Sequence, residues 1–338
     1  MKALVVHGAG DLRFDDLVEP APDQGQVLVR NTHGGICGSD LHYYKHGAVG
    51  AFELREPLVL GHEVVGRVAG DPAGALAAGT PIAIHPATPC DQCPECATGV
   101  RNVCRNTRYF GSAASMPHTQ GGFCEFKVVR QDQVRVLPET LPLSRAVLAE
   151  PLAVGLHALN RAGGVAGANV LVGGSGPIGI LVAGAAKAAG AAEVWTTDLL
   201  DHPLQIARAV GVDRTVRIGA EALPDQYFDV AIEASGASVA VGATLAAVRR
   251  RGVMVQLGMF PPGPRHAELS ALVAKEIDYR GAFRFDTEFD DAIALLARTD
   301  ALDPVITHTF DLPDAVQAMD VAANPAASGK VILRLSDD

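Results

Sequence analysis

Four cysteines in the segment PATPCDQCPECATGVRNVC have types and spacing that suit a metal: Cys90, Cys93, Cys96 and Cys104. Four closely spaced thiolates favour tetrahedral zinc, and such a closed set leaves no position open for water or substrate. The segment is rich in turn residues and poor in apolar ones, so a metal would pin a lobe that lacks a core of its own. We therefore expect a structural zinc site here.

Two other interpretations of this cluster are weaker. A pair of disulfides is improbable in a reducing compartment. A zinc-ribbon module that binds nucleic acid would need basic residues nearby, and this segment lies in an acidic chain with few of them.

A second set of metal-binding side chains is scattered along the chain. It comprises Cys37 in GGICGSD, His62 and Glu63 in LGHEVVG, and Glu150 in LAEPLAVGLHA. A thiolate, an imidazole and a carboxylate around zinc leave the fourth position free, as catalysis requires. Adjacent side chains diverge in a regular backbone. We therefore expect Cys37, His62 and Glu150 to bind catalytic zinc, with Glu63 close by and able to replace Glu150. Taken singly, each has an ordinary structural explanation.

A glycine-rich turn indicates a dinucleotide site. The strand-like run NVLVG is followed by Gly174, Ser175, Gly176, Pro177, Ile178 and Gly179, and then by an alanine-rich helical stretch. In this pattern the first glycine permits a tight turn, the second lets backbone amides approach a pyrophosphate, and the third lets the helix pack on the strand. The alternative is a glycine-rich turn in an α/β domain that binds nothing.

Asp198 indicates which dinucleotide is bound. It ends the next strand-like run, in the position where an acidic residue accepts hydrogen bonds from the adenosine ribose hydroxyls and repels a 2′-phosphate. The residues that follow, LLDHPLQ, contain no Arg or Lys that would hold such a phosphate. We therefore expect NAD in preference to NADP.

The elements that carry these residues fall into two kinds. Up to about residue 140, short extended segments such as KALVVH, QVLVRN, TPIAIHP and FCEFKVV are broken by Gly and Pro, as in an irregular, mostly β domain. From about residue 144 to 285, β-rich runs alternate with alanine-rich helical stretches. This alternation predicts a parallel sheet covered by helices. Six runs read as its strands: NVLVGG, EVWTTD, RTVRI, FDVAIEAS, GVMVQLG and IDYRGAF.

These patterns predict an α/β protein of two domains. Residues 1–145 and 290–338 would form the zinc-containing domain, because we expect the mixed helix and strand segments of the last fifty residues to pack back onto the N-terminal part of the chain. Residues 146–289 would form a six-stranded, doubly wound Rossmann domain. A continuous helix from about Arg145 to Arg161 would join the two.

The bulk composition excludes several classes of protein. With 28 Lys and Arg against 38 Asp and Glu, the formal net charge of −10 disfavours nucleic acid and anionic membranes as partners. The N-terminus has neither the apolar core nor the cleavage site of a signal peptide, and no apolar run is long enough to span a membrane. We expect a cytoplasmic protein with metal-binding cysteines.

The motifs also carry a family resemblance. The stretch GGICGSDLHYYKHGAVGAFELREPLVLGHEVVGRV resembles the zinc-containing medium-chain dehydrogenases, especially their polyol branch, in which a GroES-like catalytic domain precedes the Rossmann domain. The stretches RYFGSAASMPHTQGGF, LAEPLAVGLHA, RRRGVMVQLGM and KEIDYRGAFRFDTEFDDAI are similar to the L-idonate 5-dehydrogenase family, which oxidises L-idonate to 5-ketogluconate. The resemblance implies two zinc ions per subunit, a small sugar acid or polyol as substrate, and a homo-oligomer, a tetramer or a dimer.

The resemblance gives roles to further residues. Ser39 would accept the alcohol proton and His42 would pass it outward, while Arg284 would lie beside the nicotinamide and the substrate pocket. Tyr43 and Phe52 match positions near the substrate in polyol relatives. Without the resemblance, a turn hydroxyl, a loop histidine, a surface arginine and two packing aromatics would be the preferred interpretations.

The substrate is the least determined part. A carboxylate substrate would need a cation in the cleft, for which Arg108, Arg284 and His118 are candidates. A sorbitol- or xylitol-type polyol dehydrogenase would share every motif above. Outside this class remain a non-catalytic nucleotide-binding relative and a zinc hydrolase, but the first needs no open zinc site and the second no dinucleotide turn. Cys124 belongs to neither zinc set and receives no function.

Overall fold

The structure is a computed structural model that describes residues 1–337. Its central part holds one six-stranded parallel sheet in the order β15-β14-β13-β16-β17-β18. These strands are β13 (Asn169–Gly173), β14 (Glu193–Asp198), β15 (Arg214–Arg217), β16 (Phe228–Glu233), β17 (Val248–Gln256) and β18 (Asp278–Gly281). All six predicted runs contribute a strand, so the doubly wound sheet is confirmed. The order reverses between β13 and β16, and in such sheets ligands bind at the carboxyl ends of those strands.

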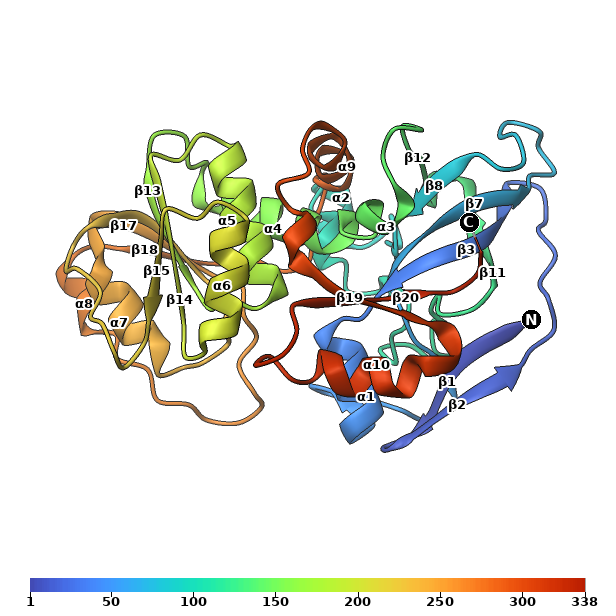
Figure 1. Cartoon of the computed structure of the whole chain (residues 1–338), viewed down its shortest axis with the longest axis horizontal. Helices are drawn as coiled ribbons and strands as arrows, with labels where there is room; N and C mark the ends of the chain where they lie inside the picture. The colour runs from blue at the N-terminus through green and yellow to red at the C-terminus, as the bar shows by residue number, and fades with distance from the viewer. Residues whose placement is uncertain (338) are drawn as a thin grey trace.

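Helices cover both faces of this sheet (Figure 1). They are α4 (Ala149–Ala162), α5 (Pro177–Ala188), α6 (Asp201–Ala209), α7 (Ala240–Ala247) and α8 (Ser270–Ala274). Small residues bring α4 close to α5, since a Cβ on Gly155 would lie 3.3 Å from Val182. Val170 and Val172 of β13 and Ile180 of α5 are fully buried between the layers. This burial fixes where the N-terminus of α5 stands.

The expected continuous helix from Arg145 to Arg161 is wrong. The structure has two helices there, α3 (Leu143–Ala146) and α4, separated at Val147 and Leu148. Pro151 explains the break, because a proline has no N–H for the carbonyl four residues earlier and its ring collides with that carbonyl. The carbonyl in question is that of Val147. The break starts a fresh helix whose first turn carries Glu150.

A seven-stranded sheet organises the mostly β part. Its strands are β3 (Gln26–Gly35), β7 (Glu63–Gly70), β8 (Pro81–Ile84), β11 (Phe126–Arg130), β12 (Val134–Val136), β19 (Ile306–Asp311) and β20 (Lys330–Arg334). One edge of β3 pairs with β7, and its other edge is shared by β11 and β20. The C-terminal segment therefore packs onto the N-terminal, mostly β part, as expected.

The remaining elements are short. The strands are β1 (Lys2–Gly8), β2 (Asp11–Asp16), β4 (Ala48–Val49), β5 (Phe52–Glu53), β6 (Leu58–Val59), β9 (Ala87–Thr88) and β10 (Arg108–Tyr109). The helices are α1 (Gly38–His46), α2 (Pro94–Ala97), α9 (Phe289–Arg298) and α10 (Ala315–Ala322), with 3-10 turns η1 (Arg101–Val103), η2 (Gln131–Gln133), η3 (Asp303–Val305) and η4 (Leu312–Asp314).

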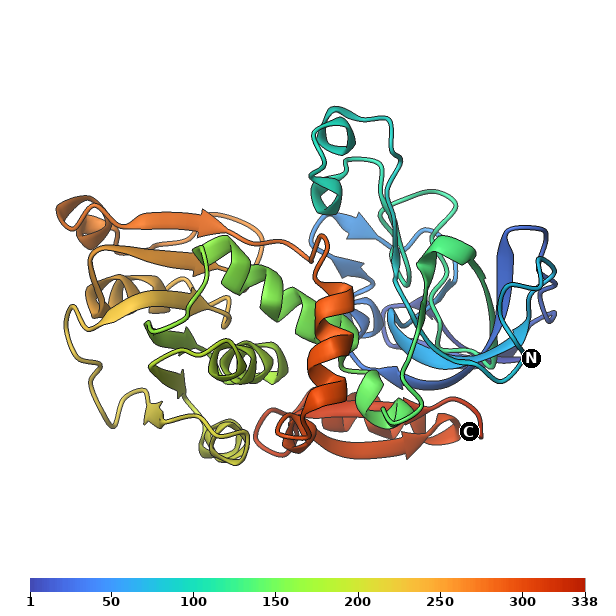
Figure 2. The same cartoon turned by 90° about the horizontal axis from the view of Figure 1, so that it is seen from above.

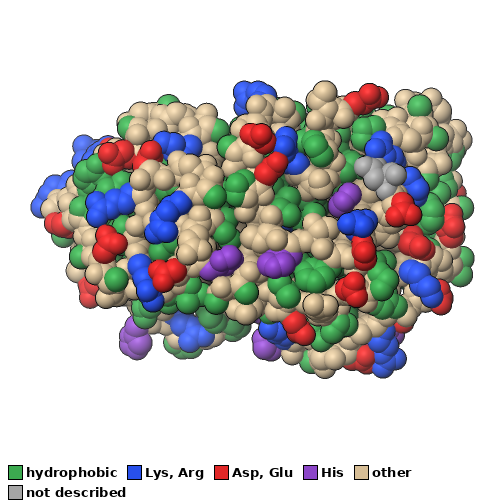
Figure 3. All heavy atoms as spheres, in the orientation of Figure 1, with side chains coloured by type: hydrophobic (Ala, Val, Ile, Leu, Met, Phe, Trp, Pro, Cys, Tyr) green, Lys and Arg blue, Asp and Glu red, His purple; other side chains and the backbone are tan. Residues whose placement is uncertain are grey.

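The two parts lie side by side, with α4 and α9 between them (Figure 1). Figure 2 shows that the segment around α2 and η1 projects from the body of the molecule. On the face drawn in Figure 3, acidic and basic side chains are interspersed and form no broad patch of one sign. Within residues 1–337, none of the helices has the length and apolar character needed to span a bilayer.

Candidate functional site

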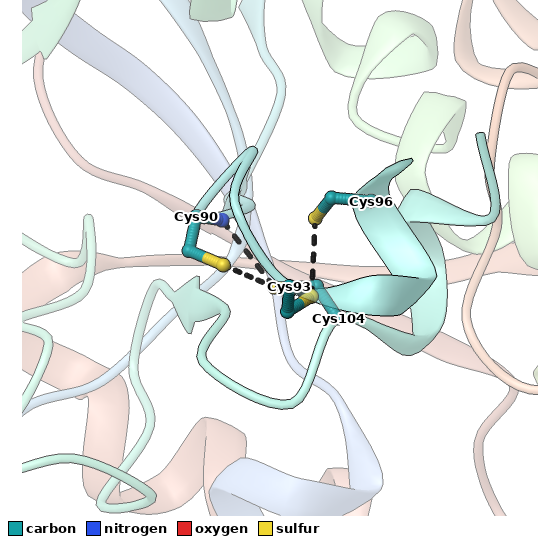
Figure 4. Close-up of side chains that lie close together, drawn as sticks. All are labelled: Cys90, Cys93, Cys96 and Cys104. Atoms are coloured by element: carbon teal, nitrogen blue, oxygen red, sulfur yellow. Dashed lines mark hydrogen bonds between the residues drawn. The ribbon is translucent and has the colours of Figure 1, made fainter. Parts of the chain in front are cut away.

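The four cysteines of the projecting lobe converge, as predicted (Figure 4). The Sγ–Sγ distances are 3.4 Å from Cys93 to Cys96, 3.7 Å from Cys93 to Cys104 and 3.5 Å from Cys104 to Cys90. Zinc–sulfur bonds of about 2.3 Å in a tetrahedron separate the sulfurs by about 3.8 Å. All four thiols are free, so the donor set fits a zinc ion held by sulfur alone.

This four-cysteine cluster is what the lobe has in place of a core. Neither α2 nor η1 buries any side chain. A segment with so little buried apolar surface gains too little from burial to fix its own conformation. The structural role expected from the sequence is consistent with this geometry.

A second group of potential ligands lies deep in the mostly β part. The ligand atoms of Cys37, His62 and Glu63 all lie within 4.8 Å of one another. Cys37 stands at the junction of β3 and α1, and His62 precedes β7. His62 and Glu63 are 6% and 1% exposed, so a metal here would be almost wholly surrounded by protein.

The carboxylate inside this group is Glu63, and Glu150 is not part of it. Regular backbone would turn the adjacent side chains of His62 and Glu63 apart, but regular strand begins only at Glu63. Gly61 has a φ of +94°, which makes the chain turn directly before His62. The two neighbours therefore converge. Glu150 lies nearby and accepts a hydrogen bond of 2.5 Å from the hydroxyl of Tyr109.

Three residues that the sequence reasoning missed surround this group. Lys330 donates to both carboxylate oxygens of Glu63 at 2.7 Å and to the carbonyl of Ile36 at 3.0 Å. Asp40 accepts the backbone N–H groups of Cys37 and Gly61 at 2.9 and 3.1 Å. Tyr109 is the third. A lysine directly before the apolar run VIL was the one available signal for these contacts.

The electrostatics of the group call for a cation. Burial opposes protonation of His62, but the negative charges of Cys37 and Asp40 outweigh it and raise the pKa of the imidazole to about 10. Burial also raises the pKa values of the Asp40 and Glu150 carboxyls. A bound dication would supply the charge that these buried anionic groups lack. Thiolate, imidazole and carboxylate donors with one position left open are the set that zinc takes in catalytic sites.

The glycine-rich turn adopts the geometry expected for a pyrophosphate site. Gly174 has a φ of +90°, and a Cβ there would lie 2.9 Å from Ser235. A Cβ on Gly179 would lie 1.9 Å from the carbonyl oxygen of Gly174, so only glycine allows this packing of α5 on β13. A Cβ on Gly176 would meet nothing within 4 Å. Space is therefore open in front of the α5 N-terminus, where backbone N–H groups and the helix dipole attract an anion. Pro177 and Ile178 form the first turn of that helix.

Asp198 stands at the carboxyl end of β14, beside this turn. Its two oxygens accept the N–H groups of Ser175 at 2.9 Å and Leu200 at 3.0 Å. Each oxygen keeps a further lone pair. The carboxylate is thus fixed at the turn with acceptor capacity remaining for hydroxyl groups.

Arg284 packs against two aromatic rings. Its guanidinium stands 4.1 Å from the centre of the Tyr109 ring and 4.8 Å from that of Phe283. No carboxylate within residues 1–337 forms an ion pair with it, and burial lowers its pKa. Arg284 lines a cavity of about 620 Å³ together with Phe52 and Arg108. Arg284 and Arg108, neither of which is ion-paired in the part of the chain that the structure describes, therefore suit an anionic ligand.

Four other predicted residues have clear positions. Ser39 and His42 lie three residues apart on α1, Ser39 half-buried and His42 exposed. Tyr43 is 2% exposed, packs in the core and accepts the Ala113 N–H at 2.9 Å. His118 is buried, and its two ring nitrogens contact the N–H of Arg55 and the carbonyl of Ser115. Both ring nitrogens of His118 are therefore occupied by backbone groups.

A Rossmann sheet with a glycine-rich turn, next to an open set of zinc-type ligands and a separate four-cysteine cluster, defines a zinc-containing, nicotinamide-dependent oxidoreductase. Comparison with known families agrees. Residues 23–139 match the alcohol dehydrogenase GroES-like domain, and residues 177–298 match the zinc-binding dehydrogenase domain. The chain belongs to the zinc-containing medium-chain dehydrogenase family, in its polyol branch.

Individual relatives place the chain more finely. It is 39% identical to L-idonate 5-dehydrogenase (NAD(P)(+)) of Escherichia coli over 91% of each chain. It is 36% identical to sorbitol dehydrogenase of Gallus gallus over 94% of this chain and 92% of that one. The crystal structure of L-idonate 5-dehydrogenase from Escherichia coli superposes with a TM-score of 0.91, covering 98% of this chain and 97% of that one.

Proposed function

We propose that this protein is an L-idonate 5-dehydrogenase: it oxidises a secondary alcohol of L-idonate to the ketone of 5-ketogluconate and reduces NAD. The observation that carries the proposal is the guanidinium of Arg284, which forms no ion pair with any of residues 1–337, lines a cavity and stacks on the ring of Tyr109. Tyr109 in turn binds Glu150, next to the Cys37 and His62 group. A sugar acid offers a carboxylate for the cation and a hydroxyl for the metal site. The similarity to the Escherichia coli enzyme supports the same substrate.

We assign catalytic zinc to Cys37, His62 and a carboxylate. Glu63 is the carboxylate within reach in the observed arrangement, and Glu150, now bonded to Tyr109, would be the alternative ligand. The four-cysteine cluster holds the second, structural zinc. When bound, catalytic zinc lowers the pKa of a substrate hydroxyl, and the nicotinamide accepts the hydride.

The remaining work falls to side chains of this chain. Ser39 takes the hydroxyl proton at its Oγ and His42, one helical turn further along α1, passes it to solvent. Partial burial lowers the pKa of His42, which helps the imidazole release the proton again. Arg284 orients the substrate carboxylate, and Phe52 lines the same cavity. The net change is one proton released and one hydride transferred for each alcohol oxidised.

NAD is the proposed cofactor because the fixed carboxylate of Asp198 has acceptor capacity for ribose hydroxyls and would repel a 2′-phosphate.

We also propose the domain division at residues 145/146 and 289/290. A homo-oligomer is the proposed assembly: β18 is an edge strand of the parallel sheet, and Tyr279 on this strand and Val273 of the preceding helix α8 are exposed.

The test is a parallel assay of NADH formation at 340 nm with zinc-loaded protein. L-Idonate, D-gluconate, sorbitol and xylitol are each offered with NAD and then with NADP. The proposal predicts the highest kcat/KM for L-idonate with NAD. A preference for sorbitol or xylitol would contradict the substrate and leave the zinc and cofactor assignments standing.

A polyol dehydrogenase is the second candidate function, supported by the 36% identity to sorbitol dehydrogenase of Gallus gallus. Arg284→Gln separates the two candidates, because glutamine keeps hydrogen-bonding capacity and loses the charge. If a carboxylate is the natural partner of Arg284, the KM of the variant for L-idonate rises about tenfold or more. If a neutral polyol is the natural substrate, its KM changes little.

A further inference from the structure

The side chain of Asn102 joins the four-cysteine lobe to the substrate side of the protein. Asn102 lies in η1, two residues before Cys104, and its Nδ2 donates to the carbonyl of Phe283 at 2.9 Å. The same Nδ2 lies 3.3 Å from Nε2 of His157, whose Nδ1 lies 2.9 Å from Glu288. Figure 2 shows the lobe beside the point where the chain leaves β18. A side chain of the lobe therefore holds the loop that carries Arg284.

The orientation of the Asn102 amide follows from these contacts. Its Oδ1 is buried and has no hydrogen-bond partner within the described chain. The flipped amide would place Oδ1 against the carbonyl oxygen of Phe283, and two acceptors repel each other. In the observed orientation Nδ2 donates to Phe283, and Oδ1 is left without a hydrogen bond from the described chain. A buried polar atom left without a partner is unfavourable, so the donated hydrogen bond must outweigh it.

The bond to Phe283 controls an unfavourable backbone conformation. Arg284 has a φ of +53°, in the left-handed region that residues with a Cβ rarely adopt. Such a conformation persists only when its surroundings hold it. The carbonyl of Phe283 and the N–H of Arg284 belong to one planar peptide group. Holding that carbonyl therefore fixes the plane about which φ of Arg284 is defined.

The direction of the Arg284 side chain depends on that φ. In the observed conformation the guanidinium lies over the Tyr109 ring and faces the cavity that Arg108 and Phe52 also line. With φ near its usual negative values, the Cβ would leave the backbone in another direction and carry the guanidinium away from Tyr109. Within residues 1–337, no ion pair holds the guanidinium in place.

We infer that Asn102 is a positioning residue for the substrate-binding cation: it fixes the 283–284 peptide and thereby directs the Arg284 guanidinium to the substrate carboxylate. The four-cysteine lobe is then part of the substrate-binding apparatus as well as a separate structural unit. The inference rests on the proposed function, in which Arg284 binds that carboxylate.

A double-mutant cycle of Asn102→Ala and Arg284→Ala tests the inference. Asn102→Ala is expected to raise KM for L-idonate about fivefold, the worth of one hydrogen bond, with kcat within about twofold and KM for NAD unchanged. In the Arg284→Ala background, Asn102→Ala should have no further effect on KM. Val100→Ala is the matched control, since Val100 is an exposed neighbour in the same lobe, and it should behave as wild type.

Additive effects of the two substitutions on KM would overturn the inference, as would a loss in kcat or in NAD binding with KM for L-idonate unchanged. Asn102→Gln keeps the amide and should recover part of the loss. If the protein accepts sorbitol and rejects L-idonate, the proposed function fails, and hydrogen exchange then decides the inference by itself. Amides of residues 283–286 should exchange faster in Asn102→Ala than in Val100→Ala. Equal exchange in the two variants would refute the positioning role.

Discussion

Replacing Lys330 by Met should destabilise the protein strongly. Lys330 and Glu63 are 3% and 1% exposed, and the ammonium group donates to both carboxylate oxygens at 2.7 Å. Its third donor serves the carbonyl of Ile36. Lys330→Met leaves all three acceptors in place without this cation, inside a group that already holds other anionic side chains.

The size of the effect follows from this geometry. Two unit charges 2.7 Å apart attract by about 6 kcal/mol at an effective dielectric constant of about 20. Desolvation cancels part of this attraction in the wild type, but a lone buried charge remains fully penalised. We therefore expect Lys330→Met to lose about 3–5 kcal/mol of unfolding free energy. For a domain of this size, that corresponds to a fall in Tm of roughly 6 °C or more.

The companion variant Lys330→Met/Glu63→Gln removes both charges. It should recover most of the lost stability, because a neutral amide beside a methionine carries no unpaired charge. The assay is thermal unfolding at pH 7, monitored by calorimetry. The zinc content of each variant is measured beforehand. All variants are compared both with zinc bound and after zinc has been removed. A Tm of Lys330→Met within about 2 °C of wild type would refute the reasoning, and so would a double variant as unstable as the single one.

Three further perturbations follow from the site. Asp198→Ala should lower the ratio of kcat/KM for NAD to that for NADP by about tenfold, and an unchanged ratio would argue against the ribose contact. Gly179→Ala places a Cβ 1.9 Å from the Gly174 carbonyl oxygen, so NADH titrated by fluorescence should bind at least about tenfold more weakly; wild-type affinity would be inconsistent with the turn geometry. Burial lowers the pKa of His85 from 6.5 to about 4, so the unfolded chain binds a proton that the folded chain does not between those values. Wild-type stability in urea titrations should therefore fall by about 3 kcal/mol more than that of His85→Phe between pH 6.5 and pH 4, and parallel curves would contradict this.

Local patterns in the sequence were enough to predict the Rossmann sheet and the four-cysteine cluster. The six strands followed from alternating β-rich and alanine-rich runs, and the cluster from the short spacing between Cys90 and Cys104. Each strand, helix or cysteine spacing in these patterns can be recognised in a short stretch of chain. The prediction of one helix from Arg145 to Arg161 was wrong because it took no account of Pro151, which separates α3 from α4.

The contacts around the second ligand group could not be read from the sequence. Whether Glu63 or Glu150 joins Cys37 and His62 depends on a positive φ at Gly61, which a regular-backbone argument cannot foresee. The ion pair of Lys330 with Glu63 spans 267 residues of chain. The bond from Asn102 to Phe283 spans 181. Such pairings depend on how the β part, the lobe and the Rossmann sheet pack against one another.

The most direct test of the central claim is the zinc content and activity of Cys37→Ala. Wild-type protein should hold about two zinc ions per chain, and Cys37→Ala about one, kept by the four-cysteine cluster. The variant should remain folded by circular dichroism, bind NADH, and show no turnover of L-idonate. Turnover at the wild-type rate in a variant that holds only the zinc of the four-cysteine cluster would contradict the account, because the reaction would then proceed without metal at Cys37 and His62.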